Sequence, residues 1–358
     1  MSTPMPATEA AKPARDFTYI KPSGRRLTEY EALSVHMQPD ALDFDRPRGN
    51  LNITEWYLLR PDGAALWRPE STRLRHGDWF AYRDPAQQWQ RTYVRQQEQQ
   101  ETSIARITED AGLDGSLTRL APGWISEVLC RHYRAWSFFE YAIFRALAPA
   151  QREALGDTIG NVLCFQSVDH LRHAQDVILY LVELENYAAG VDDSRGKDAW
   201  LNAAAYQPSR RLAEQIMATD DWAELLIGLN LVVAPLLQQM AVSDLVRRNA
   251  LINGDGVAAH IVSTAERDRR RNLAAAQAFV RMVTATDVAD AAHNRPVIQE
   301  WLDRWTALAL AAAQALAPVY AAAPIAAIGH AESLAAASAA GAALSHELGF
   351  TSACGATA

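Results

Sequence analysis

Long segments with apolar residues spaced by threes and fours fill the chain from residue 96 onward, and they most constrain its fold. Between residues 151 and 187, for example, Val162, Phe165, Val168 and Leu171 recur at the spacing of one helix face. Prolines and glycines separate the segments. The predicted helices are Gln96–Ala111, Trp124–Ala148, Gln151–Tyr187, Ser209–Ala218, Trp222–Ala250, Val257–Val283, Pro296–Tyr320 and Ala331–Leu348. With no GxGxxG motif and no P-loop, the pattern predicts an all-α fold.

Two residues predict local features of the helix at Trp222–Ala250. Asp220 or Asp221 precedes it and could cap its first turn, since carboxylates accept hydrogen bonds from free amide groups there. Pro235 lies inside it and predicts a kink.

The first 95 residues have a different texture. Residues 1–16 are rich in Ala, Pro, Thr and Lys and are expected to be disordered. Residues 17–95 combine helix-breaking prolines with many aromatic residues, which indicates an extended docking arm. The arm could wrap around its own helical body or dock on another subunit, where aromatic side chains dominate contact energy. The predicted interface residues are Trp56, Tyr57, Trp67, Trp79, Trp89 and Tyr93.

Composition excludes several classes of protein. The net charge of −8 argues against nonspecific binding to nucleic acid, which needs a basic surface. Cys130, Cys164 and Cys354 are far apart and form no CxxC pair, so neither a disulfide framework nor a zinc site is expected. No stretch reaches about 18 uninterrupted apolar residues, so we expect no membrane span. We therefore expect the protein to be cytoplasmic.

Polar residues on the predicted helices resemble a carboxylate-bridged di-iron site that has lost ligands. Such sites take one Glu from each of two helices and a Glu-x-x-His motif from each of the other two. Here Glu140, His170, His173 and Glu266 keep part of that set, while Arg269 replaces an imidazole. Leu229 lies where the fourth helix should supply a carboxylate. Arginine cannot coordinate a metal, so we expect Arg269 to pair with Glu140 or Glu266. The sequence predicts vestigial positions with no catalytic, cofactor-binding or metal-binding role.

More ordinary interpretations stay open. Two histidines three residues apart usually belong to a helix surface or core without any metal. The arginines at 267 and 269–271 more often form a solvated or ion-paired helix face than a phosphate site. Asp169, Arg172 and Asp176 could form i, i+3 and i, i+4 pairs within one helix.

Three further stretches carry a resemblance to a known family. They are Asp84–Tyr93 (DPAQQWQRTY), Trp222–Pro235 (WAELLIGLNLVVAP) and Pro296–Trp305 (PVIQEWLDRW). With the degenerate site, they resemble the β (small hydroxylase) subunit of bacterial multicomponent soluble di-iron monooxygenases, from about Phe17 to Tyr320. The resemblance implies a ferritin-like (ribonucleotide-reductase-like) helical bundle at 96–322, with an Ala-rich helix and tail at 323–358. One departure is that 169–175 keeps more of the α-subunit pattern than a β chain should.

The resemblance also implies partners and a reaction. A di-iron α subunit and a γ subunit would complete an α2β2γ2 hydroxylase, served by a coupling protein and an NADH reductase with FAD and a 2Fe–2S cluster. The complex would insert one oxygen atom from O2 into a hydrocarbon, with a short alkane such as propane or a cyclic ether favoured over aromatic and alkene substrates. Two alternatives are a self-contained ferritin-like oxidase with ligands Glu140, His170, His173 and Glu266, and an unrelated helical scaffold.

Overall fold

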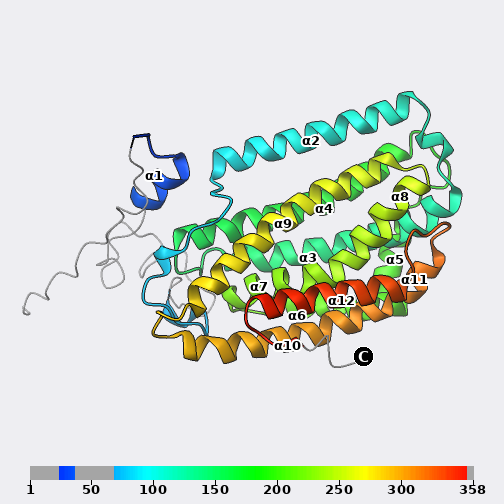
Figure 1. The fold of residues 1–358 in the computed structure, drawn as a ribbon. Helices are drawn as coiled ribbons and strands as arrows, with labels where there is room; N and C mark the ends of the chain where they lie inside the picture. Colours follow the sequence, from blue (N-terminus) through cyan, green and yellow to red (C-terminus); the bar gives the residue numbers. More distant parts are fainter. Residues whose placement is uncertain (1–23, 37–67, 353–358) are drawn as a thin grey trace, which may run out of the picture.

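The computed structural model describes residues 24–36 and 68–352, and this part of the chain contains helices and no β-strand. The prediction of an all-α fold is therefore confirmed. Four long helices form the centre of the molecule (Figure 1): α3 (Arg134–Ala150), α4 (Asp157–Leu184), α7 with its continuation η7 (Trp222–Gly228 and Leu229–Arg247) and α9 (Gly256–Thr284). α3 packs against α4, while α4 and η7 both pack against α9. This is the bundle expected of a ferritin-like fold.

Further helices cover the bundle on both sides. In Figure 1, α2 (Gln90–Leu113) lies along one side, over α4 and α9. α10 (Ala291–Ala315) and α12 (His330–Glu347) pack against η7 on the other side. α5 (Ser194–Asn202) and α6 (Gln207–Met217) lie against α3. Shorter helices complete the described chain: α1 (Glu29–His36), η2 (Pro69–Ser71), η3 (Trp79–Ala81), η4 (Leu117–Arg119), η5 (Trp124–Tyr133), η6 (Ala204–Tyr206), α8 (Arg248–Ile252) and α11 (Ala317–Ala322).

Two of the central segments are π-helices, which have one more residue per hydrogen-bonded turn than an α-helix. η5 leads directly into α3, and η7 continues α7 without a break. Pro235 lies inside η7. Proline has no amide hydrogen, so an α-helical hydrogen bond is lost there. Pro235 thus lies within a long π-helical stretch of the bundle, and the kink expected there stays a prediction.

Most helix boundaries agree with the predicted ones to within three residues. Three starts differ by more: α2 begins at Gln90 rather than Gln96, α4 at Asp157 rather than Gln151, and α10 at Ala291 rather than Pro296. In addition, α5 lies within the segment 189–208, which was predicted to be a loop. The cap before α7 is Asp221, whose carboxylate accepts hydrogen bonds from the amides of Ala223 (3.0 Å) and Glu224 (3.2 Å). This confirms one of the two candidate caps.

Residues 68–95 of the predicted arm pack on the chain's own bundle. Trp79 is buried, with its ring centroid 5.5 Å from that of Trp222 and 6.3 Å from that of Phe279. Tyr93 is also buried and stacks on Phe165 at 4.3 Å. Because this chain itself covers both rings, they are not available for the predicted contact with another subunit.

The remaining interface candidates are less restricted by the structure. Trp89 is half-buried at the start of α2. Trp56, Tyr57 and Trp67 lie outside the described residues. Their contact with another subunit stays a prediction.

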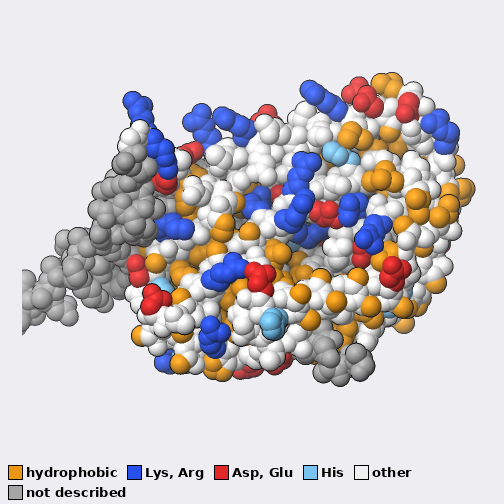
Figure 2. Space-filling view, in the orientation of Figure 1, with side chains coloured by type: hydrophobic (Ala, Val, Ile, Leu, Met, Phe, Trp, Pro, Cys, Tyr) orange, Lys and Arg blue, Asp and Glu red, His pale blue; other side chains and the backbone are white. Residues whose placement is uncertain are grey.

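Within residues 24–36 and 68–352, two helical stretches are long and apolar enough to span a membrane. They are Trp222–Ile252, whose most apolar window is 83% buried within the protein, and Ala291–Ala322, whose window is 44% buried. The first is the bundle's own core helix, and the second contributes the buried side chains of Trp301 and Trp305. The core helices of globular proteins are commonly as long and as apolar as a membrane-spanning helix, so length and composition alone are weak evidence for a membrane span. On the face in Figure 2, basic and acidic side chains are interspersed.

Candidate functional site

Glu140 of α3 lies at the centre of the four-helix bundle and is buried. Its Oε1 accepts hydrogen bonds from Trp136 Nε1 and from Gln238 Nε2 of η7, each at 3.1 Å. Its Oε2 faces α4, where His170 Nδ1 lies 2.5 Å away. Burial raises the pKa of Glu140, but the charge and hydrogen bond of His170 outweigh burial and lower the pKa to about 2. Glu140 is therefore a carboxylate.

The two predicted histidines converge on this carboxylate from α4. His173 Nδ1 lies 3.9 Å from Glu140 Oε2, while His173 Nε2 lies 3.2 Å from Asp268 Oδ2 of α9. One donor atom each from Glu140, His170 and His173 lies within 4.8 Å of the others, and all three side chains are buried. The structure thus brings together three of the six positions selected from the sequence.

Two aspartates connect α4 and α9 beside these histidines. Asp268 forms ion pairs with Arg172 and with Arg271, the latter at 3.0 Å, and accepts a hydrogen bond from Gln97 Nε2. Burial opposes ionisation of Asp268, but the hydrogen bond from His173 and the charges of Arg172 and Arg271 lower its pKa.

Asp169 completes this charged layer. It pairs with Arg271 and accepts hydrogen bonds from Asn272 Nδ2 (3.0 Å) and Tyr93 OH (2.9 Å). Within α4, Arg172 also pairs with Asp176 at 3.2 Å, which is one of the i, i+4 pairs anticipated above. The carboxylates that a second metal would need are therefore already neutralised by arginines.

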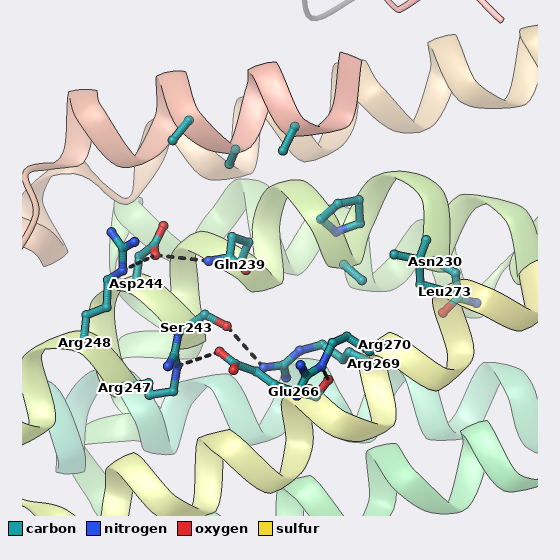
Figure 3. Close-up of a pocket in the computed structure, with 15 residues that line it drawn as sticks. Asn230, Gln239, Ser243, Asp244, Arg247, Arg248, Glu266, Arg269, Arg270 and Leu273 are labelled. Atoms are coloured by element: carbon teal, nitrogen blue, oxygen red, sulfur yellow. Dashed lines mark hydrogen bonds and ion pairs between the residues drawn. The ribbon is translucent and has the colours of Figure 1, made fainter. Parts of the chain in front are cut away.

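Glu266 does not join this centre, and Arg269 acts on it through its charge, which helps to lower the pKa of Glu140. Both residues line a cavity between η7, α9 and α12, which has a volume of about 450 Å³. Figure 3 shows the residues that line it. Glu266 forms an ion pair with Arg247 (2.7 Å), and Arg269 Nη2 donates a long hydrogen bond (3.4 Å) to Ser243 Oγ. Among the described residues, Arg269 forms no ion pair with Glu140 or Glu266. The expected ion pair is therefore not formed. Glu266 pairs instead with Arg247, one turn after Ser243 on η7, and Arg269 interacts with Glu140 and Glu266 through its charge alone.

Leu229 is buried in η7, as expected for an apolar replacement of a ligand. The neighbouring Asn230 forms a reciprocal amide pair with Gln166 of α4, at 3.0 and 3.1 Å. η7 reaches the centre through Gln238, which donates to Glu140. In a di-iron protein this helix would supply an anionic ligand. Here η7 instead contributes two neutral amides, those of Asn230 and Gln238.

The arrangement does not fit a pair of iron ions. Two such cations need about four carboxylates and two imidazoles, since the anionic oxygens neutralise and bridge them. The described centre offers Glu140 and two histidines, because Asp169 and Asp268 are paired with arginines and Glu266 is paired with Arg247. We therefore assign no di-iron chemistry to this chain.

Sequence reasoning missed several residues that build the centre. Asp268 and Gln238 received no role, although Asp268 lies beside Arg269 in the very segment that was singled out, and Arg271 was expected only in a solvated or ion-paired helix face. The missing signal is three-dimensional: Asp268 is two residues after Glu266, which places it about 200° around the helix and toward α4. A rule based on Glu-x-x-His spacing cannot find it.

Comparison with known proteins agrees with this geometry. The sequence profile described as Methane/Phenol/Alkene Hydroxylase matches residues 56–287. The chain belongs to this hydroxylase family. This protein is therefore a member of the family in which the described bundle centre lacks a full set of di-iron ligands.

Three relatives in this hydroxylase family carry informative names. The propane 2-monooxygenase hydroxylase small subunit of Rhodococcus jostii is 29% identical over 86% of this chain and 81% of its own length. The β chain of methane monooxygenase component A from Methylosinus trichosporium is 27% identical over 85% of this chain and 77% of its own. The toluene-4-monooxygenase hydroxylase β subunit of Ectopseudomonas mendocina is 24% identical, over 86% and 90%.

Two solved structures share the fold. A chain of toluene 4-monooxygenase with bound toluene superposes with a TM-score of 0.70 at 22% identity, covering 87% of this chain and 99% of that one. A chain of phenol hydroxylase from Pseudomonas sp. OX1 gives 0.75 at 18% identity, covering 98% and 99%. The ferritin-like helical bundle is therefore confirmed.

Proposed function

We propose that this chain is the non-catalytic β subunit of the hydroxylase component of a multicomponent monooxygenase. The observation that carries the proposal is the bundle centre, where the fold of a di-iron protein is kept but the ligands for two irons are not. The names of the relatives support it, since they are small or β subunits of hydroxylase components. Catalysis would then belong to a partner subunit that holds the di-iron site.

The proposal includes the rest of the system. The hydroxylase would be an α2β2γ2 assembly in the cytoplasm, with iron in α. An NADH reductase containing FAD and a 2Fe–2S cluster would supply electrons, and a coupling protein would regulate the site. The complex would insert one atom of O2 into a hydrocarbon.

A short alkane such as propane, or a cyclic ether, is the substrate we propose. Identity is 29% to the propane monooxygenase subunit and 24% to the toluene one, which favours alkanes over aromatic substrates. The substrate would bind in α. The self-contained oxidase gains no support, because Glu266 is turned away from the other three residues of its proposed ligand set.

The physical role of this chain would be to support the α helices that carry iron. We propose that Trp56, Tyr57, Trp67 and Trp89 contribute to that contact, since aromatic rings supply most of the binding energy at many interfaces. Obligate interfaces of this kind bury large apolar areas.

Co-purification tests the proposal. We would express the full chain with the large-subunit gene beside its own and measure the ratio of chains after affinity capture and gel filtration. A stable complex with equal amounts of the two chains is expected, and it should weaken when Trp56 and Tyr57 are both changed to Ala. If the two chains elute separately at micromolar concentration, the proposal is wrong.

A further inference from the structure

We propose that Glu140, His170 and His173 form a binding site for one divalent transition-metal ion. This goes beyond the proposed function, which requires no metal in this chain. One donor atom of each residue lies within 4.8 Å of the other two, and each residue is no more than 5% exposed. Two helices supply the three groups, so the packing of α3 on α4 holds them together.

The two carboxylate oxygens of Glu140 have different partners. Its Oε1 is fixed by the donors Trp136 and Gln238, each at 3.1 Å. Its Oε2 is directed at His170 (2.5 Å) and His173 (3.9 Å). One oxygen is thereby anchored, and the other faces the two imidazoles, while the charge of Arg269 also acts on the carboxylate.

His173 provides an independent sign of a ligand site. Its Nδ1 is buried and has no hydrogen-bond partner, and it is the ring nitrogen nearer to Glu140 Oε2. The opposite nitrogen, Nε2, lies 3.2 Å from Asp268 Oδ2. A histidine that binds a metal through one nitrogen commonly donates the other N–H to a carboxylate, which fixes the tautomer and the ring. Asp268 itself is held by Arg172 and Arg271.

The three ligand groups determine which ion binds and how many ions the site can hold. Two imidazoles and one carboxylate hold Zn²⁺ in metalloproteases and Fe²⁺ in non-haem oxygenases, in each case with open positions for water. A second ion finds no carboxylate, for the reasons given above. The general order of affinities places Zn²⁺ above Fe²⁺ for such a site, so Zn²⁺ is the probe of choice.

Binding would replace the hydrogen bond between His170 Nδ1 and Glu140 Oε2. Metal–ligand distances of about 2.0–2.2 Å require the two donor atoms to move apart from 2.5 Å, while Oε1 keeps its two donors. The proton on His170 Nδ1 moves to the free ring nitrogen Nε2 or, if that nitrogen is already protonated, leaves to solvent, and no electron is transferred.

The test uses the full chain after treatment with a chelator and gel filtration. Zn²⁺ is titrated in competition with a chromophoric chelator, and the ligands are identified by zinc X-ray absorption. We expect one Zn²⁺ per chain with nitrogen and oxygen ligands. His170→Gln and Glu140→Gln should each weaken binding at least about 100-fold, since even supporting groups contribute 10–100-fold.

A matched control is His260→Gln on α9, which removes a histidine bonded to Ser103 away from the centre. It should leave the affinity unchanged. Circular dichroism checks that each variant folds. If a variant does not fold, an anomalous-scattering map of the wild-type chain or complex soaked in Zn²⁺ decides, with a peak expected between Glu140 and the two histidines. Absence of stoichiometric Zn²⁺, or binding that survives both substitutions, overturns the proposal.

Discussion

At the scale of single residues, buried polar groups fix how the helices meet. Asp255 is fully buried and caps α9 by accepting a hydrogen bond from the amide of Ala258 at 2.8 Å. It also accepts hydrogen bonds from Trp124 Nε1 of η5 (2.8 Å) and Tyr180 OH of α4 (2.9 Å). One carboxylate thus connects three helices.

Asp255→Ala should therefore destabilise the fold strongly. It removes a helix cap, worth about 1 kcal/mol, and leaves two buried donors without acceptors, each costing about 1–3 kcal/mol. We expect a loss of about 3–5 kcal/mol in the free energy of unfolding, measured by urea denaturation. The control is Asp290→Ala, because Asp290 precedes α10 without a side-chain cap bond. A loss no larger than that of the control would contradict the assignment.

His132 of η5 makes stability depend on pH. Its Nε2 donates to the carbonyl oxygen of Ala241 (2.7 Å), and its Nδ1 accepts from Tyr206 OH (3.0 Å), so the ring is neutral in the folded state. Burial lowers its pKa from 6.5 to about 4. Below pH 6.5 the unfolded chain binds a proton that the folded chain does not, so stability falls as the pH falls from 6.5 to 4.

This contribution should reach on the order of 3 kcal/mol across that window. Urea denaturation of the wild type and His132→Gln at pH 7 and pH 5 measures it. The wild type should lose more stability between the two pH values than the variant. Equal losses would mean that His132 is not the titrating group.

The residue scale also shows where sequence reasoning ends. Glu140, His170 and His173 could be selected because helix spacing and a known ligand pattern place them on facing helices. Asp268 and Gln238 could not, since their roles depend on helix rotation and packing that no spacing rule encodes. The partner of Arg269 was misjudged for the same reason.

At the scale of helices, close packing depends on a few small residues. Gly228, the last residue of α7, lies against the indole of Trp305 from α10. A Cβ atom at Gly228 would lie 2.7 Å from Trp305 Nε1, which donates to Glu224 at 3.0 Å. Both the ring and its hydrogen bond would have to move.

Gly228→Ala should destabilise the protein by about 1–3 kcal/mol, despite the higher helix propensity of Ala, because the core cannot accommodate the methyl group. Gly341→Ala is the matched control in α12, where a Cβ would meet nothing within 4 Å. That change should stabilise by about 0.4–1 kcal/mol. Thermal unfolding of both variants distinguishes the two, and equal shifts would refute the packing argument.

Most helices could be predicted because apolar periodicity, prolines and glycines mark their ends. α5 was missed since a nine-residue helix within a Gly- and Asp-rich segment shows little periodicity. The start of α2 was misplaced because its first residues are polar, and the aromatic Tyr93 was read as part of an arm. Tertiary contacts with Phe165 and Asp169 decide its position.

At the scale of the whole molecule, an apolar face of α4 is not covered by any other segment that the structure describes. Leu179 and Val182 of α4 are 65% and 57% exposed, and Ile178 beside them is 37% exposed. They line a groove between α2 and α4 of about 860 Å³. Exposed apolar patches of this kind commonly mark protein interfaces, and the large subunit is the occupant that the proposed function supplies.

Changing both Leu179 and Val182 to Asp should therefore weaken co-purification with the large subunit. A loss of at least about tenfold in affinity is expected, since two carboxylates would have to be desolvated. Ile325→Asp, at a side chain that is 53% exposed after α11, is the control and should leave the complex intact. If the double variant binds as the wild type does, α4 does not face the large subunit.

The central claim is that this chain supports catalysis without performing it. We would reconstitute the purified full chain with Fe²⁺, NADH, reductase, coupling protein, O2 and propane, with and without the large subunit. The account predicts an oxygenated product only with the large subunit present, and fewer than two irons in the chain alone. Two irons and product from the isolated chain would contradict it.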